Sequence, residues 1–476
     1  RSMKKLFTAA SAALLIASCT SDLSSLNENG KAPVQVPAGT LIANATVDLS
    51  DYLASINVNE NNFTLWAQHW TQTTYTDESN YNYNQRDVNG NTFDALYANV
   101  LRDLNDAKGI ISADDALPAA EKANQLAICD LLQVYTYHVL VDIHNDVPYS
   151  EALTDDVTPK YDDAAIIYAD LIARILTAHG TLSGDNGLGA YDLVYGGDSD
   201  AWKKFAASLA LKLAVRSADY DSDGTYGAKT VGEAALAAGV FTSSADNASL
   251  AYTASPPHTN PLWDDLVQSG RTDFCASNTM AGVMNAHNDP RRAVYFRNLD
   301  SLGDLTGGVY GQNSAYNSHS QPGDALEDPT LAAHFMSFGE VSFLTADAAN
   351  RGWNVQAGTA AEHYENGIRA SMAQWGVSTT DADAYMAQTT VAWDASKANE
   401  LLGTQKWLSM YMRGNEAYNT VRQYDYPAMN IADVAQRLPP NRMSYGVDEY
   451  SLNTTNVSAA NGGSDDDTDK VFWDVN

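Results

Sequence analysis

Cysteine, basic residues and long apolar runs are all scarce in this 476-residue chain. Three cysteines are too few for a disulfide scaffold or a cysteine-based metal site. Lysine and arginine total 28 against 59 acidic residues, and the formal net charge of −31 disfavours nucleic acid, anionic lipid and polyanionic ligands. Past the N-terminal segment no run of about 18 apolar residues occurs, so we expect no membrane-spanning helix in the mature chain.

Recognisable catalytic motifs are absent as well. The chain has no GxSxG, HExxH or P-loop pattern, and its nine histidines form no ligand-like cluster. Carboxylates are so abundant that a glycosidase pair cannot be chosen by sequence, because such a pair is defined by its separation in space. We therefore expect a binding protein, with no enzymatic activity and no cofactor.

The N-terminus has the pattern of a lipoprotein export signal. A basic start at residues 3–5 is followed by an apolar run at 6–16 that is too short to span a bilayer, and small residues precede Cys19. We predict a signal peptide over residues 1–18 and lipid attachment to the Cys19 thiol, which would anchor the folded body on a membrane. An ordinary secretory signal with an incidental cysteine is the alternative.

The composition changes after this signal. Residues 19–42 are rich in Ser, Asn, Gly, Pro and Asp, which predicts a lipidated flexible tether, and residues 43–476 are expected to form a single domain. Cys129 and Cys275 are the two cysteines of that domain. We expect each to be a small buried hydrophobic residue, with a mutual disulfide as the alternative.

Apolar residues recur at spacings of three and four over most of the chain, the period of an α-helix, while strand-like alternation is scarce. Small residues such as Ala206, Ala210 and Ala346 would let neighbouring helices approach closely. Since no period of about 34 residues persists, we predict a mainly α protein of degenerate tetratricopeptide-like hairpins, with its largest loop insertion at about 246–328. The strongest helical segments are 93–111, 119–142, 164–178, 202–218, 335–350, 360–375 and 399–418.

Several short motifs follow one another in a defined order. They are HNDVPYSEA at 144–152, YGGD at 195–198, NPLW at 260–263, NDPR at 288–291, HYENGI at 363–368, QKW at 405–407, EAY at 416–418, PNR at 440–442 and FWD at 472–474. With the export signal, their order and spacing resemble the SusD/RagB-like nutrient-binding outer-membrane lipoproteins of Bacteroidetes.

That resemblance implies a fold and a function. Similar proteins have a right-handed superhelical scaffold of helical hairpins with long ligand-binding loops. The chain would be a surface-exposed outer-membrane lipoprotein that binds oligosaccharides or oligopeptides and delivers them to a SusC-like TonB-dependent transporter, acting as its lid. The alternatives are an extracellular glycan- or peptide-degrading hydrolase and a surface adhesin.

Some motif residues have structural interpretations. Asp198 or Ser199 would cap the free amides of the helix that follows, as short polar side chains do at a helix N-terminus. Trp407 lies on an apolar helical face and is expected in the core. Glu416 and Arg422, on one predicted helix, are expected to form a buried charge pair.

The main candidate for ligand contact is the segment 63–86, in which aromatic residues alternate with polar ones. Rigid aromatic faces pack on sugar rings or peptide side chains, and neighbouring amides and guanidinium groups satisfy hydroxyl or amide groups. For the two tryptophans, four apart on a helix, sealing the core is an equal alternative. The candidate residues are Trp66, Trp70, Tyr75, Tyr81, Tyr83 and Arg86.

The loop at 310–319 is the second candidate. Tyr310, Tyr316 and His319 stand among glycine and amide residues, a composition suited to adaptable ligand contacts. A solvated loop without a ligand is the alternative.

One stretch resembles the opening of a calcium loop. Asp219, Asp221 and Asp223 alternate before Gly224, but the twelfth position is Thr230 instead of glutamate. Without that bidentate carboxylate a calcium site would be weak or of another geometry.

Overall fold

The structure is a computed structural model that describes residues 36–476 apart from 222, 223, 225, 226, 433 and 436. The chain divides into two units, residues Arg1–Pro37 and Ala38–Asn476, and the second contains every helix and strand of the described chain. Cys19 and the predicted signal peptide lie outside the described residues. The first helix, α2 (Ala38–Ala54), begins within the segment predicted as tether.

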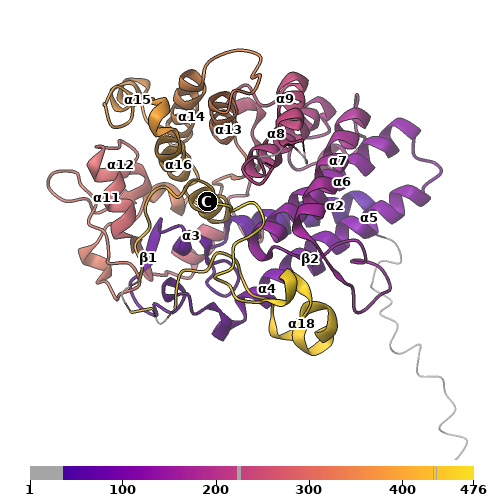
Figure 1. Ribbon diagram of the computed structural model, residues 1–476, viewed down its shortest axis with the longest axis horizontal. Helices are drawn as coiled ribbons and strands as arrows, with labels where there is room; N and C mark the ends of the chain where they lie inside the picture. Colours follow the sequence, from indigo (N-terminus) through magenta and orange to yellow (C-terminus); the bar gives the residue numbers. More distant parts are fainter. Residues whose placement is uncertain (1–35, 222–223, 225–226, 433, 436) are drawn as a thin grey trace, which may run out of the picture. The chain divides into compact units, whose positions relative to one another are not determined.

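Packed pairs of helices build most of the second unit (Figure 1). Neighbouring pairs also contact one another. Helix α7 packs on α8, and α13 packs on both α8 and α16. The mainly α prediction is confirmed, and α6, α7 and α14 begin at their predicted residues. The pairs are α6 (Ala119–His144) with α7 (Ala164–Thr181), α8 (Ser199–Arg216) with α9 (Ala228–Ala238), α13 (Phe338–Asn350) with α14 (Ala360–Gln374), and α16 (Ala398–Ser409) with α17 (Gly414–Tyr424).

Helix α6 is the central element of the core. Within the described residues it alone has the length and apolarity to cross a bilayer, and 89% of its most apolar window is buried inside the protein. Burial of this kind is what a core helix shows. The Asp198 side chain accepts amide hydrogen bonds from Asp200 and Ala201 at the start of α8, which confirms the predicted N-cap.

Shorter helices and strands fill the connections. A π-helical segment at Asp94–Leu101 joins α4 to α5 in one run. The short helices are α3 (Phe63–Trp66), α4 (Val88–Phe93), α5 (Arg102–Ala113), α10 (Pro261–Trp263), α11 (Asn278–Ala286), α12 (Arg292–Tyr295), α15 (Thr379–Met386), α18 (Val447–Leu452) and α19 (Thr454–Val457). The described residues contain four antiparallel pairs of strands: β1 (Trp70–Gln72) with β5 (Phe274–Ala276), β2 (Val147–Pro148) with β3 (Tyr161–Asp162), β4 (Ala248–Leu250) with β8 (Ala333–Met336), and β6 (Phe296–Arg297) with β7 (Gln321–Pro322).

Some predicted helices have the wrong boundaries, and the segment 202–218, for example, is helix α8 from Ser199 to Arg216. The segment 399–418 is broken between α16 and α17, where Met412 has a left-handed φ of 64°. At Gly414 a Cβ atom would lie 2.4 Å from the Thr64 amide nitrogen, so the turn brings two backbones together where only glycine fits. The segment 335–350 was extended too far, because Phe335 belongs to strand β8 and the helix starts at Phe338.

The predicted pair of Glu416 and Arg422 is also wrong, although both side chains are buried. Six residues along a helix correspond to about 240° of rotation, so the two side chains leave α17 in different directions. Glu416 accepts from Arg216 at 2.6 Å, whereas Arg422 donates to the Asp142 carbonyl oxygen at 2.7 Å. Trp407 is fully buried, as predicted, and Cys129 and Cys275 are both free and buried.

Candidate functional site

Most of the aromatic candidates are core residues. Five of the seven aromatic candidates are at most 2% exposed, so none of these five offers a ring face to a ligand. For the two tryptophans, the structure agrees with the alternative that they seal the core. Trp70 donates its indole N–H to Tyr411 Oη at 3.0 Å. Burial raises the pKa of Tyr81 to about 12, so its hydroxyl stays protonated. The five are Trp66, Trp70, Tyr81, Tyr83 and Tyr310.

Arg86 is exposed but already engaged. Its Nε lies 2.6 Å from Oε1 of Glu78, a carboxylate with no solvent exposure. The Gln72 side-chain amide donates to the other oxygen of the same carboxylate at 2.6 Å. Arg86 thus pairs with a carboxylate that also binds Gln72 at the end of β1.

The two candidate segments lie against each other, although they are more than 200 residues apart in the chain. The Ser314 amide donates to the Thr73 carbonyl oxygen at 3.0 Å, and Asn80 Nδ2 donates to the Gly311 carbonyl oxygen at 2.8 Å. Beneath these contacts, the rings of Tyr81 and Tyr310 lie 6.3 Å apart. The structure thus joins the segments into one surface.

An open hollow of about 350 Å³ lies where the segments meet, and we call it the loop hollow. Tyr75, directly after one of its lining residues, is 74% exposed and has a left-handed φ of 54°. No lining residue carries a charge, so a ligand meets hydroxyl, amide and aromatic groups. The loop hollow is lined by Thr73, Thr74, Thr272, Asn313, Ser314, Ala315 and Tyr316.

Tyr316 is held in place from the side of the loop. Its hydroxyl accepts a hydrogen bond from Arg297 Nη2 at 3.4 Å, and Arg297 is itself paired with Glu327 at 2.6 Å. A ring nitrogen of His319 lies 2.8 Å from the Ala315 carbonyl oxygen, which closes the turn that carries Tyr316. Tyr316 is partly exposed, so a positioned aromatic ring borders the loop hollow.

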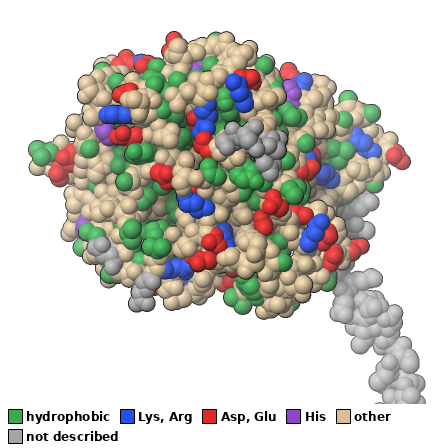
Figure 2. Space-filling view, in the orientation of Figure 1, with side chains coloured by type: hydrophobic (Ala, Val, Ile, Leu, Met, Phe, Trp, Pro, Cys, Tyr) green, Lys and Arg blue, Asp and Glu red, His purple; other side chains and the backbone are tan. Residues whose placement is uncertain are grey.

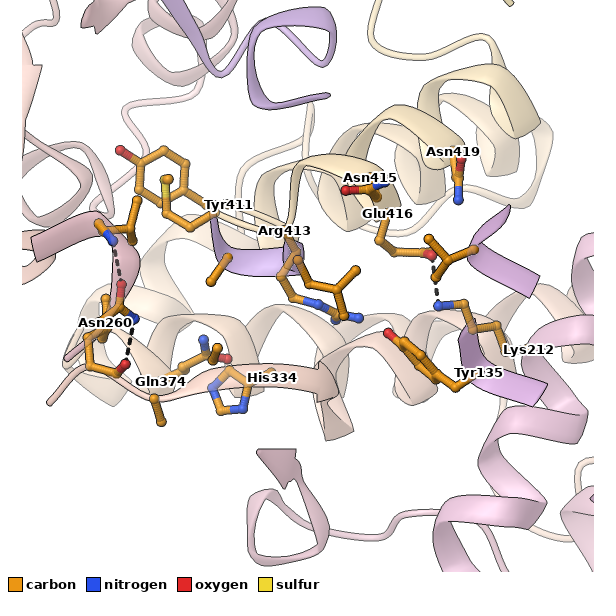
Figure 3. Close-up of a pocket in the computed structure, with 18 of the residues that line it drawn as sticks. Tyr135, Lys212, Asn260, His334, Gln374, Tyr411, Arg413, Asn415, Glu416 and Asn419 are labelled. Atoms are coloured by element: carbon orange, nitrogen blue, oxygen red, sulfur yellow. Dashed lines mark hydrogen bonds and ion pairs between the residues drawn. The ribbon is translucent and has the colours of Figure 1, made fainter. Parts of the chain in front are cut away.

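A second, more enclosed cavity of about 330 Å³ lies between helices α2, α6, α8 and α17 and residues 331–334; we call it the inner cavity (Figure 3). Lys212, Glu416 and Tyr135 stand at one end, and Asn260, Tyr411 and Gln374 at the other (Figure 3). These residues come from segments far apart in the chain. Sequence reasoning missed the cavity, because its only signal was that NPLW at 260–263 and EAY at 416–418 are among the family-like motifs.

A buried charge network borders one end of the inner cavity. Glu416 lies 2.8 Å from Lys212 and from Lys406, and Glu340 lies 2.7 Å from Arg413. Burial raises the pKa of Glu416, but the surrounding cations outweigh burial and hold that pKa well below its usual range. The network consists of Asp142, Lys212, Arg216, Glu340, Lys406, Arg413 and Glu416.

The calcium hypothesis is not tested by this structure. Asp223 lies outside the described residues, the Asp219 carboxylate is paired with Arg351 at 2.6 Å, and the Asp221 carboxylate accepts from the Ala228 amide at 2.7 Å. In the described part of the chain no group of three or more His, Cys, Asp or Glu side chains is arranged to hold a metal ion.

Comparison with known proteins identifies the family. A family model of SusD-like proteins, described as starch-binding and associating with the outer membrane, matches residues 30–446. The chain belongs to the SusD-like family. The family resemblance predicted from the motifs is confirmed. The family is described as associating with the outer membrane. No curated protein matches the chain.

Solved structures agree with this assignment. A chitin-binding SusD homologue from Flavobacterium johnsoniae is 25% identical, with 92% of this chain and 98% of that one covered and a TM-score of 0.76. Another structure, of a chitin-binding protein, is 26% identical, with 92% and 100% covered and a TM-score of 0.77. A SusD homologue from Bacteroides thetaiotaomicron shares the fold at 22% identity, with 93% and 100% covered and a TM-score of 0.77.

Proposed function

We propose that this SusD-like protein binds oligosaccharides at the loop hollow and delivers them to a SusC-like TonB-dependent transporter, as the lid of that transporter. One observation carries the assignment of the site: two polar, aromatic loops from distant parts of the chain meet around an open, uncharged hollow beside Tyr75 and Tyr316. The starch-binding description of the family and the two chitin-binding structural neighbours support a glycan as cargo.

The chemistry of the loop hollow suits a neutral sugar. The C–H face of a pyranose ring packs on a tyrosine ring, and Thr74 and Asn313, both exposed, can bond hydroxyl or acetamido groups without introducing charge. An oligopeptide with charged ends would find no opposite charge among the lining residues. On the face seen in Figure 2, acidic and basic side chains are interspersed, and no basic patch for a polyanion stands out.

Calorimetric titration with an N-acetylglucosamine hexamer, a maltohexaose and an uncharged hexapeptide tests the proposal. We expect saccharide binding, and each of Tyr75→Ala and Tyr316→Ala should weaken it, by about 2- to 12-fold if each ring contributes about 0.5–1.5 kcal/mol. Tyr191→Ala is the matched control, since Tyr191 is 44% exposed and does not line the hollow. Full affinity in both loop variants would move the site elsewhere, and peptide binding alone would replace the cargo.

The absence of catalysis is also part of the proposal, and it can be tested on the same samples. The oligosaccharides should be recovered intact after long incubation, and release of shorter products would establish the hydrolase alternative. Delivery to a transporter predicts that deleting the gene reduces uptake of the same oligosaccharide, whereas an adhesin predicts unchanged uptake.

The lipid anchor is the last part of the proposal. Lipid on the Cys19 thiol would keep the body at the outer face of the outer membrane, beside its transporter. A Cys19→Ser variant should then be released from the membrane with its glycan affinity unchanged. Retention of that variant at the outer membrane would contradict lipid attachment at Cys19.

A further inference from the structure

We propose that the inner cavity is a second binding site, separate from the loop hollow, and that it takes a small apolar monocarboxylate. Its volume of about 330 Å³ lies in the range of small-molecule pockets. If each non-hydrogen atom takes about the 30 Å³ of a liquid water, the cavity holds a molecule of roughly ten such atoms. Gln374 is exposed and residues 331–334 are half-buried, so this side of the cavity opens to solvent.

The cavity is polarised along its length. Toward Asn260 its walls are apolar and aromatic, with Leu262, Leu331 and Tyr411 among the lining residues. At the opposite end Lys212 and Glu416 face each other (Figure 3), 2.8 Å apart, and Arg413 lies between the two ends. A ligand that fits both ends has an apolar body and one polar, charged head.

The charge balance at that end favours an anionic head. Within the buried charge network four cations are held by three carboxylates, and all of these side chains are largely or fully buried. Lys212 and Arg413 are the two cations that line the cavity. An uncompensated charge is costly in a medium of low polarity, so a ligand carboxylate would supply the missing partner.

Hydrogen-bonding groups without a partner lie in the residues that form the cavity wall. Three lining side chains that are at least nine-tenths buried each have a nitrogen with no hydrogen-bond partner in the described chain: Asn415 Nδ2, Trp375 Nε1 and His138 Nδ1. Buried polar atoms of this kind are rare and call for a partner. Asn415 and Trp375 can only donate from these nitrogens, which matches the acceptor oxygens of a carboxylate. Burial lowers the pKa of His138 to about 3, so its ring is neutral and can donate one N–H.

The test varies the ligand, because changes to the buried charge network would endanger folding. Octanoate and 3-phenylpropionate, with octanamide and 3-phenylpropanamide as neutral counterparts, are titrated calorimetrically into the intact protein. We expect each acid to bind with one-to-one stoichiometry and each amide to bind about tenfold more weakly or worse, since hydrogen bonds to a charged group are the stronger ones. Equal affinity of acid and amide, or no binding of either acid at millimolar concentration, would overturn the proposal.

A cavity-filling variant locates the site. Ala332 is half-buried and lines the cavity, and Ala332→Phe should abolish acid binding, whereas Ala293→Phe, on the exposed part of α12, should not. Unchanged thermal unfolding shows that both variants are folded. Acid binding is measured without glycan, so this test stands whether or not the proposed function holds, and any glycan affinity at the loop hollow should be the same in both variants. Acid binding that survives Ala332→Phe, or glycan binding that is lost with it, would refute a separate carboxylate site.

Discussion

Replacing Glu416 by glutamine is the sharpest test of how the helical scaffold is stabilised. Glu416 is buried and accepts from Lys212 at 2.8 Å, from Arg216 at 2.6 Å and from Lys406 at 2.8 Å. Glutamine keeps the shape of the side chain but removes its charge, so three buried cations lose their common partner. We therefore expect Glu416→Gln to fold but to be substantially less stable.

The size of the loss can be estimated from the burial of the network. Removing one partner of a buried ion pair costs about 3–5 kcal/mol, because it leaves an uncompensated charge in the interior. For a domain of about 440 residues the unfolding entropy near the midpoint is about 0.9 kcal/mol per kelvin. The expected fall in Tm is therefore about 3–5 °C.

The pH dependence gives a second, independent signature. The folded pKa of Glu416 is held well below its usual range, so its contribution to stability is present above the unfolded-state pKa of about 4.3 and is lost as pH falls through the folded pKa. The Tm curves of wild type and Glu416→Gln should therefore converge in acid. Differential scanning calorimetry between acid and neutral pH measures this, with Glu365→Gln, an exposed acid on α14, as the control. A neutral-pH Tm equal to that of the control would refute the reasoning.

Two further predictions concern packing. At Gly403 a Cβ atom would lie 2.8 Å from Tyr424 Cβ, so Gly403→Ala should destabilise the protein by about 1–3 kcal/mol in urea denaturation. Gly282→Ala, in open space on helix α11, is the control and should be neutral or stabilising by up to about 1 kcal/mol. Equal effects of the two substitutions would contradict the packing argument. Burial raises the pKa of the Cys129 and Cys275 thiols to about 12. In a Cys19→Ser background, neither thiol should therefore react with a disulfide reagent until guanidinium unfolds the protein. Rapid labelling of the native protein would show that these thiols are accessible.

The helices were predictable because their signal is local. Apolar spacing placed α6, α7 and α14 at their observed starts, since a buried helical face imposes its period on the sequence itself. The break between α16 and α17 was not predictable, because it depends on a contact with Thr64, about 350 residues away in the chain. No window of sequence contains both partners of such a contact.

The candidate site was predictable in part, for the same reason. Composition found both loops that meet at the loop hollow, and Tyr75 and Tyr316 are the aromatic candidates that remain accessible there. Composition could not separate them from Tyr81 and Tyr310, because a tyrosine suits a ligand platform and a core equally well. The inner cavity had no local signal beyond two family-like motifs, since its walls assemble only when distant helices pack.

The buried aromatic candidates have a role that their sequence pattern did not indicate. Trp70 belongs to β1, the strand that leads into the loop hollow at Thr73, and its indole donates to Tyr411, which lines the inner cavity. The Tyr411 ring is in turn stacked on Tyr295 at 3.9 Å. These ring contacts thus connect the strand that leads to the loop hollow with a lining residue of the inner cavity. Because close-packed side chains cannot shift independently, these rings give the two sites a physical connection, and any effect of a bound acid on glycan affinity would by linkage be matched by an equal effect of the glycan on acid affinity.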